Sequence, residues 1–335
     1  GYDGLLKMAT NGTLHIHSGV GNLGTYSYAA NCRAAAEAMQ IPWENCEIHR
    51  GRTDRHLPHS SGQGGSNTVF THGRAMWVAA EDMIAKMKEI AAMDLGGSSD
   101  DYEIGGERVF KSSDPSQGLT YAQTAQRAIE LGGKFDGQEY PDDINPITQL
   151  ATQGLAGTGL IGVAKDKIPG QGQPPGNIVG FCEIELDTDT GKIEITDYAG
   201  IADCGTVVHP KNFDNSMRGG MVWGVGLTNL ERHVYDPQNG LPANTGLYQN
   251  KPPTNMDVPV DTIQQAVNIP DPQSPIGARG IGEPTQGAMA AALASAIRDA
   301  LDGHMFNTAP TTTDMIIDHL AGNEYSTKSL KTNTF

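Results

Sequence analysis

Glu283 is a carboxylate in a setting that could support acid–base chemistry. It follows Gly282, precedes Pro284, and stands directly before an alanine-rich stretch that predicts a mostly buried helix. A helix dipole favours a carboxylate at this end, so a simple helix-start charge is one interpretation. A general base held in a pocket with little water is the other. The residues alone leave both interpretations open.

Two glycine-rich segments could bring backbone amides against a phosphate-bearing ligand. Gly19, Gly21 and Gly24 form a G-x-G-x-x-G string between a predicted strand and a predicted helix, a pattern that also fits a nicotinamide dinucleotide site. Gly62–Thr68 joins a loop to a helix and offers amides, hydroxyls and an amide side chain to a polyoxygen ligand. A structural turn and a helix-capping loop produce the same strings, so neither is decisive alone.

Histidines occur in two pairs that could bind a metal ion. His15 and His17 alternate along a predicted strand, and His56 and His59 lie in a loop. No neighbouring run supplies further Asp, Glu or Cys ligands at a useful spacing. We therefore expect surface or satisfied core histidines, and predict no side-chain metal ligands. The four cysteines stand far apart without a Cys-x-x-Cys, which disfavours a zinc ribbon or a cysteine-ligated iron–sulfur cluster in this chain.

The charge balance narrows the class of partner. The 335 residues carry 23 Lys and Arg against 39 Asp and Glu, a formal net charge of −16. Neutralising phosphates needs clustered basic residues, so we expect neither nucleic acid nor an anionic membrane surface as a partner. No apolar run approaches the length of a membrane-spanning helix, so we expect no membrane insertion. We expect a cytoplasmic protein, with a periplasmic location left open, and a processed chain or a piece of a longer one.

The pattern of apolar and polar residues predicts an α+β fold of mixed sheets and antiparallel hairpins packed with helices. Cys182, Ile184 and Leu186 alternate with acidic residues before a Thr-Asp-Thr-Gly turn, which predicts a hairpin over 181–196. Helices are expected at about 25–39, 69–93, 121–131, 213–232 and 285–301, strands at 12–19 and 45–50, a short hairpin in 94–119, and loops over 132–178. We predict two domains, 1–165 and 166–322, and a polar tail at 323–335.

Four segments, in the right order, resemble one enzyme family. Gly280–Pro284 with its alanine-rich helix is similar to the active-site glutamate segment of the molybdenum hydroxylases, the xanthine oxidase family. The strand, glycine loop and helix of 12–40, the Gly64–Thr68 loop, and the block from Phe181 to Gly224 are similar to further segments of that family. The resemblance covers roughly 10–305 and points to the carboxy-terminal half of the molybdopterin-binding subunit. It implies that both predicted domains are molybdopterin-binding subdomains.

The resemblance also implies roles for individual residues. Glu283 matches the family's catalytic base. The implied cofactor is molybdopterin carrying molybdenum, in a dinucleotide form. Its implied contacts are Asn22, Leu23, Gly24, Thr25, Gly64, Gly65, Ser66, Asn67, Thr68, Asn215, Ser216 and Gly282. The segment Asn22–Thr25 lacks the glutamine that the family usually has beside the metal, and Ser216 replaces another glutamine.

The resemblance further implies a multi-subunit oxidoreductase. The family's upstream half, its iron–sulfur module and its flavin module have no counterpart here, so partners should supply them. The implied partners are a chain with the other half of the molybdopterin domain, a 2Fe-2S subunit, an FAD or cytochrome subunit, and a small-molecule substrate. The implied reaction oxidises an aldehyde or an N-heteroaromatic carbon, with water as the oxygen source. A nicotinamide-dependent dehydrogenase using Gly19–Gly24 and a non-catalytic scaffold subunit stay open as alternatives.

Overall fold

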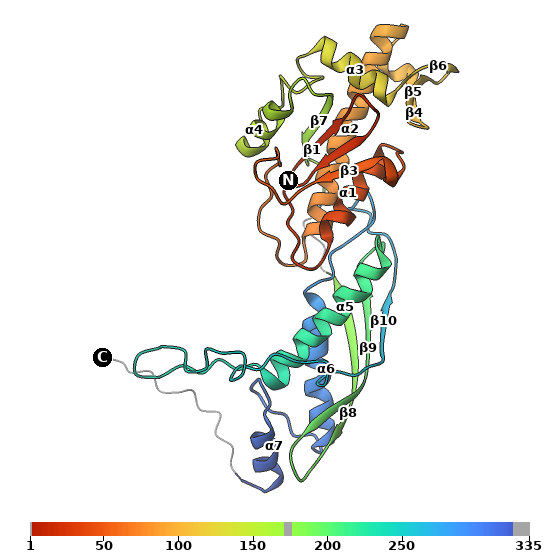
Figure 1. Cartoon of the computed structure of the whole chain (residues 1–335). Helices are drawn as coiled ribbons and strands as arrows, with labels where there is room; N and C mark the ends of the chain where they lie inside the picture. Colours follow the sequence, from red (N-terminus) through yellow and green to blue (C-terminus); the bar gives the residue numbers. More distant parts are fainter. Residues whose placement is uncertain (1, 171–175, 324–335) are drawn as a thin grey trace. The chain divides into compact units, whose positions relative to one another are not determined.

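The computed structural model describes residues 2–170 and 176–323, and the chain divides into two compact units (Figure 1). Unit 1 comprises Gly1–Pro175 and Ile269–Gly280, and unit 2 comprises Gly176–Asn268 and Ile281–Phe335. The sequence predicts a single boundary at 165/166, whereas here the segment Ile269–Gly280 also returns to unit 1. Contacts between residues that are far apart in the chain decide such a return, and local sequence patterns do not predict it. Residues 324–335 of the predicted tail lie outside the described residues.

Unit 1 is built on a four-stranded mixed sheet with the strand order β3-β2-β1-β7. Strand β1 (Asp3–Met8) pairs antiparallel with both β2 (Leu14–His17) and β7 (Leu160–Lys165). Strand β2 pairs in parallel with the edge strand β3 (Cys46–His49). The predicted strands at 12–19 and 45–50 are thereby confirmed, and their parallel pairing makes the intervening helix a single crossover.

Helices cover both faces of this sheet. Helix α1 (Ser27–Ala38) packs on α2 (Thr68–Leu95), which runs across β1 and β7 (Figure 1). Helix α4 (Pro146–Leu155) packs on the opposite face of the same two strands. The helix predicted at 69–93 is confirmed as α2, and residues at helical spacing along one of its faces are buried: Met76, Ala80, Met83 and Met87.

A three-stranded antiparallel meander extends unit 1. It consists of β4 (Tyr102–Gly105), β5 (Arg108–Lys111) and β6 (Asp114–Thr120), and helix α3 (Tyr121–Leu131) follows directly. Thr120 and Gln123 form a capping box at the start of α3. The hairpin predicted in 94–119 and the helix predicted at 121–131 are confirmed.

The prediction of loops over 132–178 is wrong in part, because this stretch contains α4 and β7. Helix α4 has a local signal, since Asn145 accepts a hydrogen bond from the Ile147 amide and Pro146 stands at the first helical position. The local sequence signal for strand β7 is weaker, because the strand is defined by its pairing with β1, more than 150 residues away in the chain. Such pairing is decided by tertiary structure rather than by local sequence.

Unit 2 contains a three-stranded sheet covered by helices. Strands β8 (Asn177–Leu186) and β9 (Ile193–Asp203) form the predicted hairpin, and β10 (Thr262–Ala266) pairs in parallel with β9. Helix α6 (Pro284–Ala300) packs on β8, and α5 (Pro210–Val225) packs on α6. A π-helical turn, Gly226–Leu230, continues α5.

The last described helix is α7 (Thr313–Leu320), which the sequence does not predict. The helices predicted at 213–232 and 285–301 are confirmed as α5 with its π-helical turn and as α6. The mixed sheets, antiparallel hairpin and packed helices confirm the α+β class. Among the described residues, none of the helices combines the length and the apolar character needed to cross a membrane.

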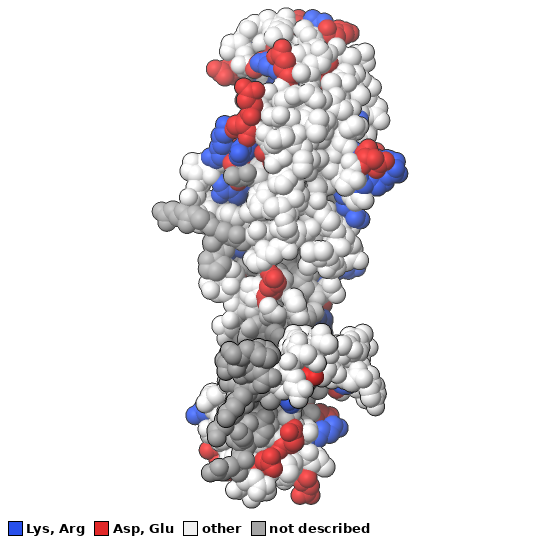
Figure 2. All heavy atoms as spheres, turned by 90° about the vertical axis from the view of Figure 1, so that its left-hand side faces the viewer, with Lys and Arg blue, Asp and Glu red and all other residues white. Residues whose placement is uncertain are grey.

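Charged side chains are scattered over the face that Figure 2 presents. Lys and Arg lie there in small groups together with Asp and Glu, and wide areas between them carry no charge. The described residues on this face form no continuous basic stripe of the kind that follows a phosphate backbone.

Candidate functional site

Gln63 joins the two glycine-rich loops of unit 1. Its Nε2 donates a hydrogen bond to the carbonyl oxygen of Gly21 at 3.2 Å, and its Oε1 accepts one from the hydroxyl of Ser27 at 3.3 Å. The predicted contact segments Asn22–Thr25 and Gly64–Thr68 therefore lie close to each other at one end of unit 1. The sequence alone places them 39 residues or more apart.

The loop Asn22–Thr25 presents its residues to the outside. All four are exposed, and Leu23 is 66% exposed despite its apolar side chain. Asn22 Oδ1 accepts a hydrogen bond from the Gly24 amide at 3.0 Å, and Gly24 has φ 85°, so this turn favours glycine. Gly19, the first glycine of the G-x-G-x-x-G string, has a structural role instead: a Cβ there would overlap the Pro58 carbonyl oxygen, so only glycine allows the two backbones to approach this closely.

The loop before α2 leaves space next to its backbone. A Cβ added at Gly62, Gly64 or Gly65 would meet no atom within 4 Å in the part of the chain that the structure describes. Gly65 has φ 61°, and α2 begins three residues later at Thr68. An open glycine backbone at the start of a long helix suits a phosphate or a pterin oxygen. The residues present therefore fit a phosphate-bearing pterin cofactor.

The segment Ile269–Gly280 packs against this loop from within unit 1. A Cβ at Gly280 would overlap the carbonyl oxygen of Ser66, so the two backbones are in direct contact. Asp271 and Arg279 form an ion pair at 3.3 Å inside the segment, in which the Asp271 side chain is buried and the Arg279 side chain is partly buried. Ser66 is thus fixed on one side by protein, while Gly64 and Gly65 stay open.

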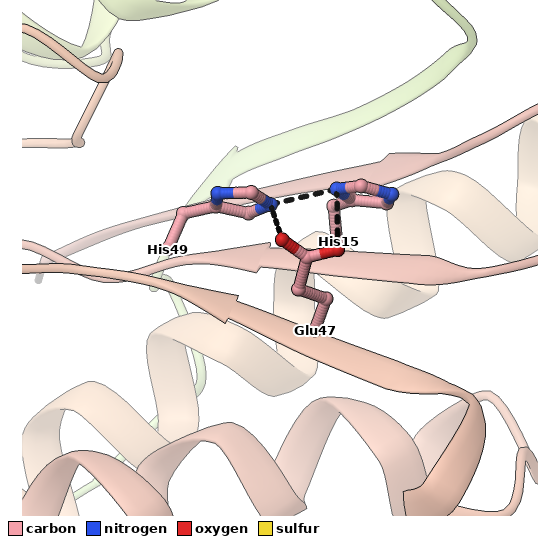
Figure 3. Close-up of side chains that lie close together, drawn as sticks. All are labelled: His15, Glu47 and His49. Atoms are coloured by element: carbon pink, nitrogen blue, oxygen red, sulfur yellow. Dashed lines mark hydrogen bonds and ion pairs between the residues drawn. The ribbon is translucent and has the colours of Figure 1, made fainter.

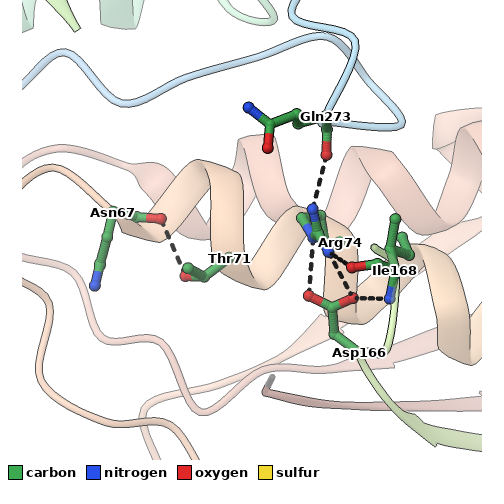
Figure 4. Close-up of polar contacts among 6 residues, drawn as sticks. All are labelled: Asn67, Thr71, Arg74, Asp166, Ile168 and Gln273. Atoms are coloured by element: carbon green, nitrogen blue, oxygen red, sulfur yellow. Dashed lines mark hydrogen bonds and ion pairs between the residues drawn. The ribbon is translucent and has the colours of Figure 1, made fainter. Parts of the chain in front are cut away.

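A buried arginine attaches the same segment to α2 (Figure 4). Arg74 donates to the Asp166 carboxylate, with Nε to Oδ2 at 2.9 Å, and its Nη1 donates to the Gln273 carbonyl oxygen at 2.9 Å. Its Nη2 donates to the carbonyl oxygen of Ile168, whose own amide donates back to Asp166 Oδ1. Because Arg74 and Asp166 are almost fully buried, this network holds α2, β7 and the segment Ile269–Gly280 together.

His72 lies on α2 between the open loop and Arg74. It is 4% exposed, and its ring packs against the Tyr2 ring in a tilted arrangement with 4.7 Å between centroids. Burial lowers the pKa of His72 to about 4, with a smaller contribution from His59. The ring is therefore neutral at pH 7 and adds no cation to the interior of unit 1.

Glu283 begins the helix α6 in unit 2, with Pro284 at the first helical position. Its side chain is half-buried. Two residues after Glu283, Thr285 is fully buried and its hydroxyl donates to the Ile281 carbonyl oxygen at 3.3 Å. Glu283 thus stands on a rigid, packed helix start rather than on a free loop.

The other predicted residues of unit 2 lie at the same end of this helix pair. Asn215 and Ser216 are on α5 immediately before Met217, whose sulfur lies 3.5 Å from the Thr285 hydroxyl. A Cβ at Gly220 would lie 2.5 Å from Thr285 Cβ and 3.2 Å from the Gly282 carbonyl oxygen. Asn215 is exposed and Ser216 is half-buried. Unit 2 therefore brings Asn215, Ser216, Gly282 and Glu283 into one neighbourhood.

Sequence reasoning missed the residues that support these loops. Gln63 lies inside the predicted loop Gly62–Thr68. Its side-chain amide, which can donate and accept hydrogen bonds at once, is a sequence signal for a residue that connects two loops. Arg74 could have been noticed as a cation among the apolar residues of α2. Its partners Asp166 and Gln273 are 92 and 199 residues away, and no local pattern connects them.

Comparison with known proteins agrees with this arrangement. A family model described as a molybdopterin cofactor-binding domain matches residues 2–259. The chain is 27% identical over 299 residues to the probable hypoxanthine oxidase XdhD of Escherichia coli (strain K12), covering 88% of this chain and 28% of that protein. It is 24% identical over 314 residues to the nicotine 6-hydroxylase large subunit of Paenarthrobacter nicotinovorans, covering 93% and 36%.

The same fold occurs in a solved enzyme structure. Quinoline 2-oxidoreductase from Pseudomonas putida 86 superposes with a TM-score of 0.74 at 23% identity, over 96% of this chain and 38% of that one. This chain thus spans 28–38% of the lengths of these three proteins. We conclude that the chain belongs to the molybdopterin cofactor-binding domain family and is a member of the molybdenum hydroxylase (xanthine oxidase) family that spans part of a large subunit.

Proposed function

We propose that the chain is the molybdopterin-binding part of a multi-subunit molybdenum hydroxylase that oxidises an aldehyde or an N-heteroaromatic carbon and takes its oxygen from water. The open backbone at Gly64 and Gly65, joined through Gln63 to the loop Asn22–Thr25, is the observation that carries the proposal. Two similar proteins have N-heteroaromatic compounds, nicotine and quinoline, in their names, which supports that substrate class.

The cofactor would be molybdopterin in a dinucleotide form. The amides of Gly64 and Gly65 would approach its phosphates, with the polar side chains of Ser66, Asn67 and Thr68 beside them. The exposed loop Asn22–Thr25 would provide a second set of contacts. In unit 2, Asn215, Ser216 and Gly282 would provide the remaining ones. When bound, the molybdenum centre supplies two-electron oxidation chemistry, which no protein side chain offers.

Glu283 would act as the general base. Its carboxylate would accept a proton from the water-derived nucleophile as that oxygen attacks the substrate carbon. The packed start of α6 fixes the position of the side chain, which a proton transfer over hydrogen-bond distance requires.

The electrons would leave through partner chains. We propose a 2Fe-2S subunit as the first acceptor and an FAD or cytochrome subunit as the next, together with a chain that carries the other half of the molybdopterin domain. The relative in Paenarthrobacter nicotinovorans is named a large subunit, which supports an assembly of several chains.

The experiment is the variant Glu283→Gln in the purified complex, with molybdenum measured per mole and turnover measured with N-heteroaromatic and aldehyde substrates. Loss of a general base should slow turnover by about 10²–10⁴-fold. Molybdenum content should stay at the wild-type level, because glutamine has nearly the shape of glutamate. Glu194→Gln, an exposed glutamate on β9, is the matched control and should keep full turnover.

Three alternative results would each exclude part of the proposal. Near-normal turnover in Glu283→Gln would remove Glu283 from the mechanism. An intact wild-type complex without molybdenum or tungsten would favour the non-catalytic scaffold. Binding of NAD(H) by such a complex would favour the dehydrogenase built on Gly19–Gly24.

A further inference from the structure

Three potential metal ligands converge on the edge of the unit 1 sheet (Figure 3). His15 is on β2, and Glu47 and His49 are on the parallel edge strand β3. His15 pairs in register with Glu47, and His17 with His49, so all four side chains lie on one face of the strand pair. The opposite face carries Leu14 and Ile16 into the core with α1 and α2.

The ligand atoms already point toward one another. His15 Nδ1 and His49 Nε2 are 2.7 Å apart, and the Glu47 carboxylate lies 3.4 Å from His49 Nε2 and 3.9 Å from His15 Nδ1. One ligand atom from each of the three residues lies within 4.8 Å of the other two. Figure 3 shows the carboxylate directed between the two rings.

The surroundings hold the two rings in this position. The side chains of His15 and His49 are 15% and 16% exposed, and the buried ring of His17 stacks on His49 at 4.7 Å between centroids. In its neutral form each imidazole offers a lone pair to a metal ion.

The donor set selects the kind of ion. Two imidazoles and one carboxylate suit Zn²⁺ and its neighbours among the transition metals. Mg²⁺ and Ca²⁺ prefer several carboxylate or carbonyl oxygens, whereas this cluster offers a single carboxylate.

We propose that His15, Glu47 and His49 form a binding site for a divalent transition-metal ion of the Zn²⁺ type, with water as a fourth ligand. The ion would fasten the edge strand β3 to β2. Two nitrogens bound to one tetrahedral Zn²⁺ lie about 3.3 Å apart, so the rings would have to separate by roughly 0.6 Å from their present hydrogen bond. Glu47, which is 57% exposed, can follow that movement.

The sequence predicts no side-chain metal ligands, because His15 and His17, like His56 and His59, are neighbours in the chain and no adjacent run completes either pair with further ligands. His17 lies on the same face as His15, but its ring stacks on His49 and it is not among the three residues whose ligand atoms converge. The ligands come instead from two strands that the crossover through α1 places side by side. This inference does not rest on the proposed function.

The test is a titration of the metal-free, full 335-residue chain with Zn²⁺ in millimolar Mg²⁺, followed by calorimetry, and a parallel titration with Co²⁺ followed by visible absorption. We expect one equivalent of Zn²⁺, the intense absorption of four-coordinate Co²⁺, and a Tm that rises by several degrees. Glu47→Gln and His49→Gln should each weaken the binding at least about tenfold. His319→Gln, in the stacked His304–His319 pair of unit 2, is the matched control and should bind as the wild type does.

Three outcomes would overturn the site. These are absence of Zn²⁺ binding by the wild type, equal affinity in wild type and Glu47→Gln, and loss of binding in His319→Gln alone. If circular dichroism shows that His49→Gln does not fold, Glu47→Gln still decides, because its exposed side chain leaves the core intact. The test involves no molybdenum, so the proposed function can fail while this site stands, or the reverse.

Discussion

The glycines of the loop Gly62–Gly65 and those of helix α5 have opposite surroundings. Next to Gly64 and Gly65, an added Cβ finds no described atom within 4 Å. On α5, a Cβ at Gly224 would lie 2.6 Å from both the Gln286 carbonyl oxygen and Met289 Cβ, because α6 packs there. The same residue type thus serves two purposes. A glycine with free space at its Cβ position, here called open, leaves room for a ligand. A glycine whose Cβ position is taken up by neighbouring atoms, here called filled, lets two backbones approach.

The segment Ile269–Gly280 shows both features within unit 1. Gly280 is filled, since its Cα packs on the Ser66 carbonyl oxygen, two residues from open Gly64. Protein therefore closes one side of the loop and leaves the other free. Substitutions that add the same bulk at open and filled positions should separate ligand binding from stability. The predictions that follow run from the largest expected effect on stability to the smallest.

Arg74→Ala tests whether the ion pair, rather than the glycine contact, holds the segment Ile269–Gly280 in place. Removing one member of a buried ion pair leaves the Asp166 carboxylate uncompensated, which costs about 3–5 kcal/mol. Denaturant unfolding followed by circular dichroism measures this loss. Arg127→Ala, which breaks the more exposed pair with Asp94, is the control and should lose much less stability, because solvent screens that pair. Equal losses in both variants would contradict the role of Arg74.

Gly224→Val tests the filled position between α5 and α6. The added methyl groups meet backbone atoms of α6, so the helices must separate, at a cost of about 1–3 kcal/mol or more. Thermal unfolding gives the measurement. Gly219→Val places the same side chain on the same helix, where an added Cβ has no described neighbour within 4 Å, and it should cost far less. If the two variants have the same Tm, the close approach of the helices is not what stabilises unit 2.

Gly280→Ala tests the filled position beside the open loop. One added methyl group overlaps the Ser66 carbonyl oxygen, so the segment must move away, at a cost of about 1–3 kcal/mol. Limited proteolysis should then cut within Ile269–Gly280 faster than in the wild type. Unchanged cleavage would show that the segment holds without this contact.

Gly287→Ala should make the chain more stable. Gly287 lies inside α6, is exposed, and has open space beside it, so alanine gains helix propensity worth about 0.5–1 kcal/mol without a clash. A rise in Tm is the expected readout. A fall in Tm would mean that the position is occupied in the intact protein.

Gly64→Val should leave stability nearly unchanged and remove the cofactor. The valine side chain meets no described atom of the protein, so the expected change in unfolding free energy is within about 0.5 kcal/mol. Molybdenum measured by elemental analysis of the purified complex should nevertheless fall to background, because the side chain occupies the space proposed for the phosphates. Gly287→Ala is the control that keeps its molybdenum. Full occupancy in Gly64→Val would show that the loop is structural only.

Local patterns were sufficient for much of the fold. The alternation over 181–196 specified the β8–β9 hairpin, and the pattern over 69–93 specified the helix α2. The position of Glu283 before an alanine-rich helix also follows from the sequence, because Pro284 and small residues act locally. The order of four such segments was enough to identify the family.

Tertiary structure decided which of these residues meet. The pairing of β2 with β3 brings Glu47 and His49 to His15, and the pairing of β7 with β1 creates a strand in a stretch predicted as loop. Arg74 finds Gln273 across 199 residues. Such contacts depend on loop closure and on the packing of whole elements, which act over distances that a sequence window does not cover. The sequence by itself determined where the glycines stand and which elements begin or end at them. Only the packed structure decided which glycines are filled by protein and which stay open for a ligand, because that depends on volume contributed by distant segments.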